Sequence, residues 1–318
     1  MNKRIKVSKQ NIVITYGEAI QEFLDEKALL NLTEQTLKHY KENLERFAKY
    51  SKFDDDTPIT EVNAKSVNKY KQHYLKQDVS YVTVNTYMIV LRTFVKWCER
   101  KDYIEPIEIQ LVRGQETRVK YYTQEEMEKL LEKPIGSNHY GVWRTWAIIA
   151  FIYATGARAQ SVCDVKMEDV DFYRKEVTFT HQKNKTLLVL PISEQLEKVL
   201  KEYIRRCSMK NEEYLFPAIT GEQLTTSGLN QAINNYCKNR RVPNRGVHAL
   251  RHSFASQYIR NGGNPVKLQR ILNHKSFRMT ERYLHLFSED LKVDYSDFSP
   301  LDTATRKKSR TKNVGNKE

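Results

Sequence analysis

Cysteine, glycine and proline are scarce in this chain of 318 residues, which contains 4 Cys, 11 Gly and 8 Pro. No two cysteines form a Cys-x-x-Cys pair, and the four positions are Cys98, Cys163, Cys207 and Cys237. This spacing excludes a zinc ribbon and a disulfide framework, and it indicates reduced thiols. So little glycine and proline excludes a collagen-like or broadly disordered chain.

Long apolar runs are also missing. No stretch approaches the ~20 apolar residues of a membrane span, and residues 1–10 lack the apolar core of a signal peptide. We therefore expect a cytoplasmic protein with no membrane partner. No Walker loop is present, and the acidic run Asp54–Asp56 has the character of a solvated turn, not of a metal site. We accordingly expect no cofactor, no metal and no small-molecule substrate.

Positive charge is abundant. Lys and Arg number 53 against 39 Asp and Glu, so the net charge is +14 and the pI is about 9.4. A protein this basic usually binds a polyanion, most often nucleic acid. The length of the chain favours two domains over one.

The first hundred residues have helical periodicity. Apolar residues recur at steps of three and four in two runs, Leu37, Tyr40, Leu44, Phe47 and Tyr87, Leu91, Phe94, Cys98. Thr33 precedes the first run as a capping residue, and Pro58 marks a break. The pattern predicts a basic arm at 1–11 and a bundle of about four helices at 12–106.

A polar segment at 107–121 has the composition of a linker. The capping box Thr123–Glu126 opens a second domain at 122–299, which is mainly helical. The β-rich segments Val177–Thr180 and Leu187–Leu190 flank a polar turn and predict one hairpin. Further helices are predicted at 193–207, 225–240, 248–261, 265–273 and 278–287. A basic tail at 300–318 is low in apolar residues and is expected to be disordered.

Three short motifs contain side chains that suit a phosphate site. His248 and Arg251 are three positions apart on an expected helix, so they share one face. A guanidinium offers a planar fork of donors to a phosphate. Arg158 follows a glycine turn, and His274 precedes Tyr283 by nine positions. Taken singly, each has an ordinary structural explanation, such as a cap, a surface cation or a core aromatic residue.

Together, the order and spacing of these motifs resemble the tyrosine recombinase (phage integrase) family, from about Thr15 to Phe298. The similar segments are His248–Ala255 (the family's HxLRHTFA box), Thr155–Arg158 (TGLR), Ile271–His274 with Tyr283 (LLGH…Y) and Thr83–Trp97 (the last core-binding helix). The resemblance implies a mainly α fold. It consists of an N-terminal four-helix, SAM-like core-binding domain and a mostly helical catalytic domain with a small antiparallel sheet.

The resemblance also implies a role for each matching residue. Arg158 and Arg251 would hold the scissile phosphate of DNA. His274 would hold a non-bridging oxygen, and His248 would assist proton transfer or contact the phosphate. Tyr283 would be the nucleophile.

The family's catalytic lysine lies in the hairpin turn, usually eight residues before a proline. Counting back from Pro191 gives Lys183, and Lys185 is the alternative if the hairpin is shifted by two residues. Such a lysine is suited to protonate the departing 5′-oxygen of DNA.

Two positions depart from the family's pattern. Ser161 stands where Glu often supports the first arginine, so support must come from elsewhere, for which Asp164 is a candidate. Asn273 replaces the usual Gly before His274, and Asn also tolerates left-handed backbone.

The implied enzyme is a site-specific DNA recombinase with type IB topoisomerase-like chemistry, which forms a covalent 3′-phosphotyrosine without metal or ATP. Its expected partners are double-stranded recombination sites, on which a homotetramer assembles. The basic tails and the departures from the housekeeping pattern favour a mobile element or phage over Xer-like resolution of dimers. The sequence is also compatible with a DNA-binding homologue with lost or weak catalysis and with a topoisomerase-like relaxing enzyme. A helix-turn-helix regulator would leave the Tyr283 segment unexplained.

Overall fold

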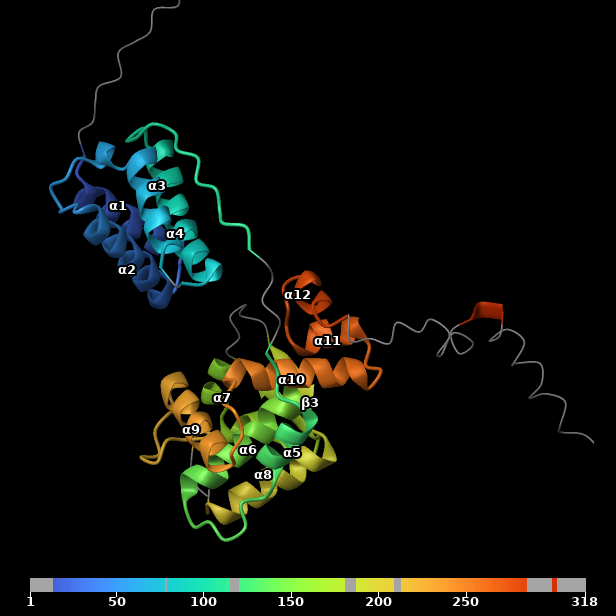
Figure 1. Cartoon of the computed structure of the whole chain (residues 1–318). Helices are drawn as coiled ribbons and strands as arrows, with labels where there is room; N and C mark the ends of the chain where they lie inside the picture. Colours follow the sequence, from blue (N-terminus) through green and yellow to red (C-terminus); the bar gives the residue numbers. More distant parts are fainter. Residues whose placement is uncertain are drawn as a thin grey trace, which may run out of the picture. The chain divides into compact units, whose positions relative to one another are not determined.

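The computed structural model describes residues 14–77, 79–114, 120–180, 187–208, 213–284 and 299–301. The chain divides into two compact units, Met1–Thr117 and Arg118–Glu318, which Figure 1 shows in blue to cyan and in green to red. Within the described ranges, no helix combines the length and the apolar character needed to cross a membrane.

The described part of the N-terminal unit contains four α-helices, as the periodicity predicts. Its elements are α1 (Tyr16–Leu29), α2 (Glu34–Ser51), the 3-10 helix η1 (Ile59–Glu61), α3 (Ala64–Leu75) and α4 (Tyr81–Arg100). Side chains cap the first turn of each α-helix, and the predicted cap Thr33 is one of them. Helix α4 packs against the other three, and its Phe94 and Trp97 meet Phe23 of α1 edge to face.

Residues 107–112, which follow α4, pack against the N-terminal unit. Ile107 and Ile109 are buried in its apolar core. The Asn85 side chain donates to the carbonyl of Val112 at 2.9 Å and accepts from its amide at 2.8 Å. The first part of the segment with linker composition therefore packs as an extension of the bundle.

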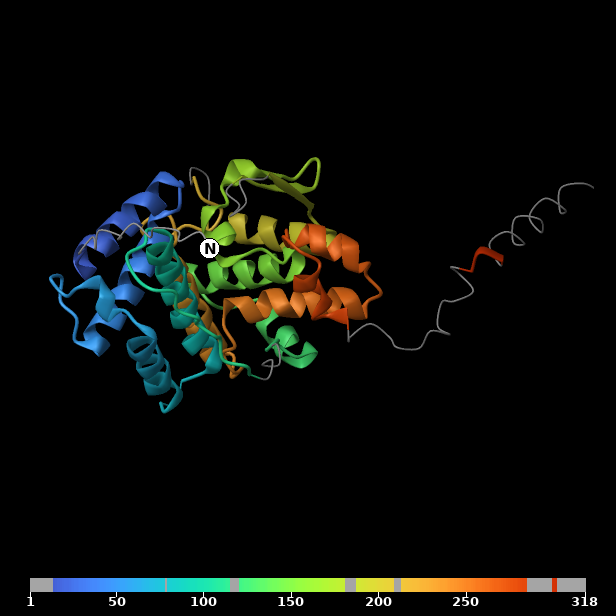
Figure 2. The same cartoon turned by 90° about the horizontal axis from the view of Figure 1, so that it is seen from above.

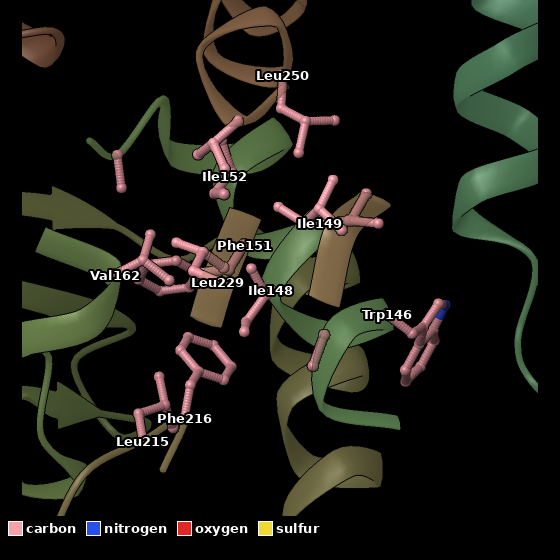
Figure 3. Packing of buried hydrophobic residues seen from close by; sticks show 14 of the residues in the cluster. Trp146, Ile148, Ile149, Phe151, Ile152, Val162, Leu215, Phe216, Leu229 and Leu250 are labelled. Carbon is pink, nitrogen blue, oxygen red and sulfur yellow. The ribbon is translucent and has the colours of Figure 1, made fainter. Parts of the chain in front are cut away.

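The second unit surrounds one apolar helix. Its elements are α5 (Gln124–Leu131), α6 (Tyr140–Thr155), α7 (Ala159–Asp164), η2 (Met167–Asp169), β1 (Val170–Asp171), β2 (Glu176–Phe179), β3 (Leu188–Pro191), α8 (Glu194–Arg206), α9 (Thr226–Asn239), α10 (Val247–Arg260), α11 (Pro265–Ile271) and α12 (Arg278–Glu281). Helix α6 packs against α5, α8, α9 and α10. Figure 3 shows its Phe151 and Ile152 among Leu229 of α9 and Leu250 of α10. A helix that is apolar on all sides must be enclosed in this way.

A three-stranded antiparallel sheet lies in this unit, in the order β1-β2-β3. Val177 pairs with Leu190 and Phe179 with Leu188, so the predicted hairpin strands are confirmed. The sequence did not predict β1, since two residues are too few to show an alternating pattern.

One helix boundary differs from the predictions. The last predicted helix, 278–287, is present as α12 for four residues only, Arg278–Glu281, and positions 285–287 lie outside the described residues. Helix α6 ends at Thr155, because Gly156 caps it in the left-handed region, and α7 then begins separately. The basic arm at 1–11 and most of the basic tail at 300–318 lie outside them as well.

Candidate active site

Helix α10 carries three polar residues on one face, His248, Arg251 and His252. Positions three and four apart on a helix are neighbours, so these side chains project in one direction. Helix α10 packs against α6 on one side and contacts α11, which lies beside it in Figures 1 and 2. The site therefore forms where the end of α6, the face of α10 and the α11–α12 segment meet.

Arg251 is buried, with 9% of its surface exposed. Its Nη1 donates to the carbonyl of Gly156 at 2.6 Å, and its Nη2 donates to the carbonyl of Leu272 at 2.7 Å. Burial, and then the nearby charge of Arg158, lower the pKa of Arg251 to about 10. The guanidinium remains charged at neutral pH, and two backbone carbonyls fix its plane.

Gly156 is required for this arrangement. Its φ is +67°, in the left-handed region. A Cβ at this position would lie 2.6 Å from the ring of Phe254 and 2.7 Å from a methyl group of Leu272. Only glycine allows the end of α6 to approach α10 closely enough for its carbonyl to accept from Arg251.

Arg158 is the N-cap residue of α7, with extended backbone. Its Nη2 donates to the carbonyl of Asn273 at 2.8 Å, and burial lowers its pKa. Asn273 has φ +47°, the left-handed conformation that its identity allows. Leu272 and Asn273 thus turn consecutive carbonyls toward Arg251 and Arg158, and both arginines line one pocket.

Asp164, the residue expected to support Arg158, has two glutamine side chains as hydrogen-bond donors. Oδ1 of Asp164 accepts hydrogen bonds from Gln160 at 2.7 Å and from Gln223 at 2.8 Å. Ser161 is buried at the start of α7. One support for Arg158 is its hydrogen bond to the carbonyl of Asn273, which the presence of Ser161 leaves in place.

His274 contacts a buried hydroxyl. Its Nδ1 lies 2.8 Å from Oγ1 of Thr280, a residue with 0% exposure. Burial and the charges of Arg251, Arg158 and Arg282 lower the pKa of His274 to about 4, so the ring is neutral at pH 7. A neutral imidazole has one N–H. When the hydroxyl of Thr280 donates to Nδ1, the ring proton of His274 lies on Nε2, and this N–H can donate to a phosphate oxygen.

Tyr283 is 2% exposed. Its buried neighbours are Ala255, Ile259, Leu268 and Leu272. Its hydroxyl lies 2.5 Å from Nδ1 of His252. Burial raises the pKa of Tyr283, while Arg251 and Arg282 act in the opposite direction.

The structure brings four of the sequence-predicted residues into one region, Arg158, Arg251, His274 and Tyr283. His248 lies on the same face of α10 but is exposed. Lys183 and its alternative Lys185 lie outside the described residues. The roles of these residues stay predictions. In the described part of the chain, no group of three or more His, Cys, Asp or Glu is placed to hold a metal ion.

Sequence reasoning missed two residues at this site, His252 and Thr280. His252 had a usable signal, since it lies four positions after His248 and next to Arg251. Thr280 had none, because its contact with His274 depends on how α12 folds back.

Two family models match the chain. The phage integrase family matches residues 120–290, and the phage integrase SAM-like domain matches residues 15–108. Among curated relatives, the tyrosine recombinase XerC of Bacillus subtilis is 27% identical over 281 residues, which are 85% of this chain and 92% of that protein. XerC of Oceanobacillus iheyensis is 25% identical over 286 residues, again 85% and 92%.

Solved structures have the same fold. A Tn1549 transposon integrase in complex with a circular intermediate DNA has a TM-score of 0.69 at 18% identity and covers 93% of this chain and 99% of that one. A lambda integrase dimer bound to a COC′ core site has a TM-score of 0.70 at 15% identity and covers 87% and 98%.

Proposed function

The chain belongs to the phage integrase family, and we propose that it cleaves DNA with Tyr283 while Arg158, Arg251 and His274 hold the scissile phosphate. As a tyrosine recombinase it is a site-specific enzyme that cleaves and rejoins DNA strands. The observation that carries the assignment of residues is the pair of consecutive carbonyls at Leu272 and Asn273. They orient both arginines beside His274, in the unit that also contains Tyr283.

The charge of this cluster suits phosphoryl transfer. The transition state has negative charge on the phosphate oxygens, and preorganised donors stabilise it most where water is excluded. Arg251 is already desolvated and fixed, so it needs little reorganisation when a phosphate arrives. His274 adds a neutral donor at Nε2, and exposed His248 is placed to contact the phosphate from the rim of the site.

The reaction transfers a phosphodiester to tyrosine. Oη of Tyr283 bonds to phosphorus, and the bond from phosphorus to the 5′-oxygen breaks, which leaves a 3′-phosphotyrosine. The 5′-oxygen needs a proton, and Lys183, with Lys185 as the alternative, is the proposed donor. The covalent bond conserves the energy needed to rejoin the strands. Since Tyr283 is 2% exposed, neighbouring groups must move when DNA binds before a phosphate can reach its hydroxyl.

We further propose that the biological substrate is the end of a mobile element or phage, and that four copies assemble on it. Support comes from the basic segments at both ends of the sequence, from Ser161 and Asn273, and from the modest 25–27% identity to XerC proteins. Lambda integrase, a relative in fold, has been observed as a tetramer on a Holliday junction. Resolution of chromosome or plasmid dimers by an Xer-like reaction is the alternative.

Covalent trapping tests both proposals. In a duplex with a nick next to the cleavage site, attack releases a short fragment that carries the new 5′-hydroxyl. This fragment diffuses away and cannot be rejoined, so the protein stays attached to the 3′-phosphate. Wild-type protein should form this adduct, and Tyr283→Phe should form none, a loss of at least ~10⁴-fold, while still binding DNA. Failure of the wild type to form an adduct at any concentration would contradict catalysis, and relaxation of plasmids without a specific site would favour a topoisomerase.

Sequencing the trapped DNA from cells then identifies the substrate. Junctions between a mobile element and its insertion site are expected. A single chromosomal site near the replication terminus, or a plasmid resolution site, would instead support the Xer-like alternative.

A further inference from the structure

The hydroxyl of Tyr283 has one hydrogen-bond partner in the described part of the chain, Nδ1 of His252 at 2.5 Å. His252 follows Arg251 on α10 and is partly buried. The two rings are tilted by 46° with centroids 5.9 Å apart, so they meet through their polar atoms and are not stacked. The family resemblance assigned no role to this histidine.

The direction of this hydrogen bond depends on the tautomer of His252. Burial, and then the charges of Arg282, His248 and Arg251, lower the pKa of His252 to about 4, so its ring is neutral at pH 7. The pKa of Tyr283 is raised by burial, so its phenol retains the proton. With the imidazole proton on Nε2, the phenol O–H donates and Nδ1 accepts with its lone pair, and this is the tautomer in which His252 can take the phenolic proton.

The other histidines of the cluster are placed differently. Nδ1 of His274 faces the hydroxyl of Thr280. His248 is exposed, one helical turn before His252. A general base acts from within hydrogen-bond reach of the proton it removes, and among the described residues of this DNA-free structure His252 holds that position.

We propose that His252 is a catalytic residue that accepts the phenolic proton of Tyr283 during attack on DNA, an inference that rests on the proposed function. As Oη bonds to phosphorus, the phenolic proton passes to Nδ1 of His252. The electron pair of the breaking bond leaves with the 5′-oxygen, which takes its proton from an ammonium group, the role proposed for Lys183.

Binding of DNA strengthens this base. The groups that face His252 are Arg282, His248, Arg251, His274 and Tyr283, and the two arginines disfavour a charged imidazole. An incoming phosphodiester brings a negative charge that offsets them, so the imidazolium becomes more stable when the substrate is in place. The phenol thus keeps its proton without DNA and loses it only against a bound phosphate.

The discriminating variant is His252→Asn, compared on the nicked duplex with His139→Asn as a matched control on an exposed histidine outside the site. The Asn side-chain oxygen can accept the hydrogen bond of Tyr283 near the position of Nδ1, but it does not take up a proton. We expect adduct formation to slow about 100-fold at pH 7. The defect should shrink by about tenfold per pH unit above pH 7, because the phenolate then forms without a base. The control should match the wild type.

A second substrate separates the base from the acid. Sulfur in place of the bridging 5′-oxygen leaves without a proton, so it should rescue Lys183→Ala but not His252→Asn. His252→Gln is measured in parallel, and the conclusion is drawn from the variant that keeps wild-type DNA affinity.

Two results would overturn the inference. One is adduct formation by His252→Asn within twofold of the wild type with an unchanged pH profile. The other is rescue of His252→Asn by the sulfur-containing substrate. If the wild type forms no adduct or Tyr283→Phe retains activity, the proposed function itself fails.

Discussion

A lysine of the N-terminal unit, Lys101, and an arginine of the second unit, Arg251, hold their positive charges in different ways. In the N-terminal unit, Lys101 lies 2.8 Å from the carboxylate of Glu22 and 3.4 Å from that of Glu26, at the surface. In the second unit, Arg251 is buried and its described partners are carbonyl groups. A carbonyl orients a guanidinium but does not neutralise it. Among the described contacts, carboxylates match the charge of Lys101 but not that of Arg251, to which the proposed function assigns a phosphate.

The contrast extends within the second unit. Arg245 donates to both carboxylate oxygens of Glu126, at 2.6 and 3.1 Å, and this pairing raises the pKa of Arg245. For Arg251, burial dominates and the pKa falls. Among the described contacts, Arg245 is thus accompanied by a carboxylate, whereas Arg251 donates to carbonyl oxygens.

Among the substitutions that test this comparison, the largest effect is expected from Arg251→Lys. An ammonium cannot hold two carbonyls and a phosphate with one planar fork. Formation of the covalent adduct should fall by about 10²–10³-fold, the usual effect of losing one transition-state donor. Arg245→Lys is the matched control, and it should change the rate by no more than about twofold. Equal losses in the two variants would remove the distinction between paired and unpaired arginines.

A smaller effect is expected from Thr280→Val. Loss of the hydroxyl frees Nδ1 of His274 and lets the ring proton move away from Nε2. Adduct formation should fall about tenfold, the worth of one ordinary hydrogen bond, with little change in DNA affinity. Thr280→Ser should restore the rate. Failure of serine to do so, with both variants folded, would indicate that the methyl group and not the hydroxyl matters.

Acid should destabilise the second unit by a modest amount. His252 and His274 have pKa values of about 4 in the folded protein, below the ~6.5 of an unfolded chain. Between these values the unfolded state binds more protons, so stability is complete above about pH 6.5 and is lost as pH falls toward 4. Calorimetry of the DNA-free protein at pH 7, 6 and 5 should show a falling melting temperature. Replacement of both histidines by Asn should flatten that slope.

The smallest effect is expected from Lys101→Met. The ion pairs of Lys101 with Glu22 and Glu26 are solvent-exposed, and such pairs contribute little. Methionine can still cover the ring of Trp97, over which the ammonium lies at 5.4 Å. The melting temperature should match that of the wild type within replicate error. A clear loss of stability would show that surface carboxylates matter more to the N-terminal unit than its aromatic core suggests.

Local sequence patterns predicted most of the elements. Helix α4, Tyr81–Arg100, contains the run Tyr87, Leu91, Phe94 and Cys98, whose apolar spacing predicts a helix. The capping box at Thr123 and Glu126 is present with both of its hydrogen bonds. These features depend on residues within one or two helical turns, so the sequence contains all the information they need. The same holds for the hairpin strands on either side of residues 181–186.

The candidate active site depends on contacts between residues that are far apart in the sequence. The order of its motifs identified Arg158, Arg251, His274 and Tyr283 as candidates, and the left-handed backbone at Asn273 followed from its identity. The partners of these side chains did not follow. Arg251 reaches a carbonyl 95 positions earlier in the chain and another 21 positions later.

By itself, the sequence determined which helices form, where they are capped and which residues can react, because propensity, periodicity and ordered motifs are local properties. Only the tertiary structure decided that Arg158 donates to the carbonyl of Asn273, that Thr280 meets His274, and that His252 is hydrogen-bonded to Tyr283. Each of these contacts joins segments whose approach is set by packing. The approach of α6 to α10 at Gly156 is the clearest case, since it depends on the absence of a single Cβ.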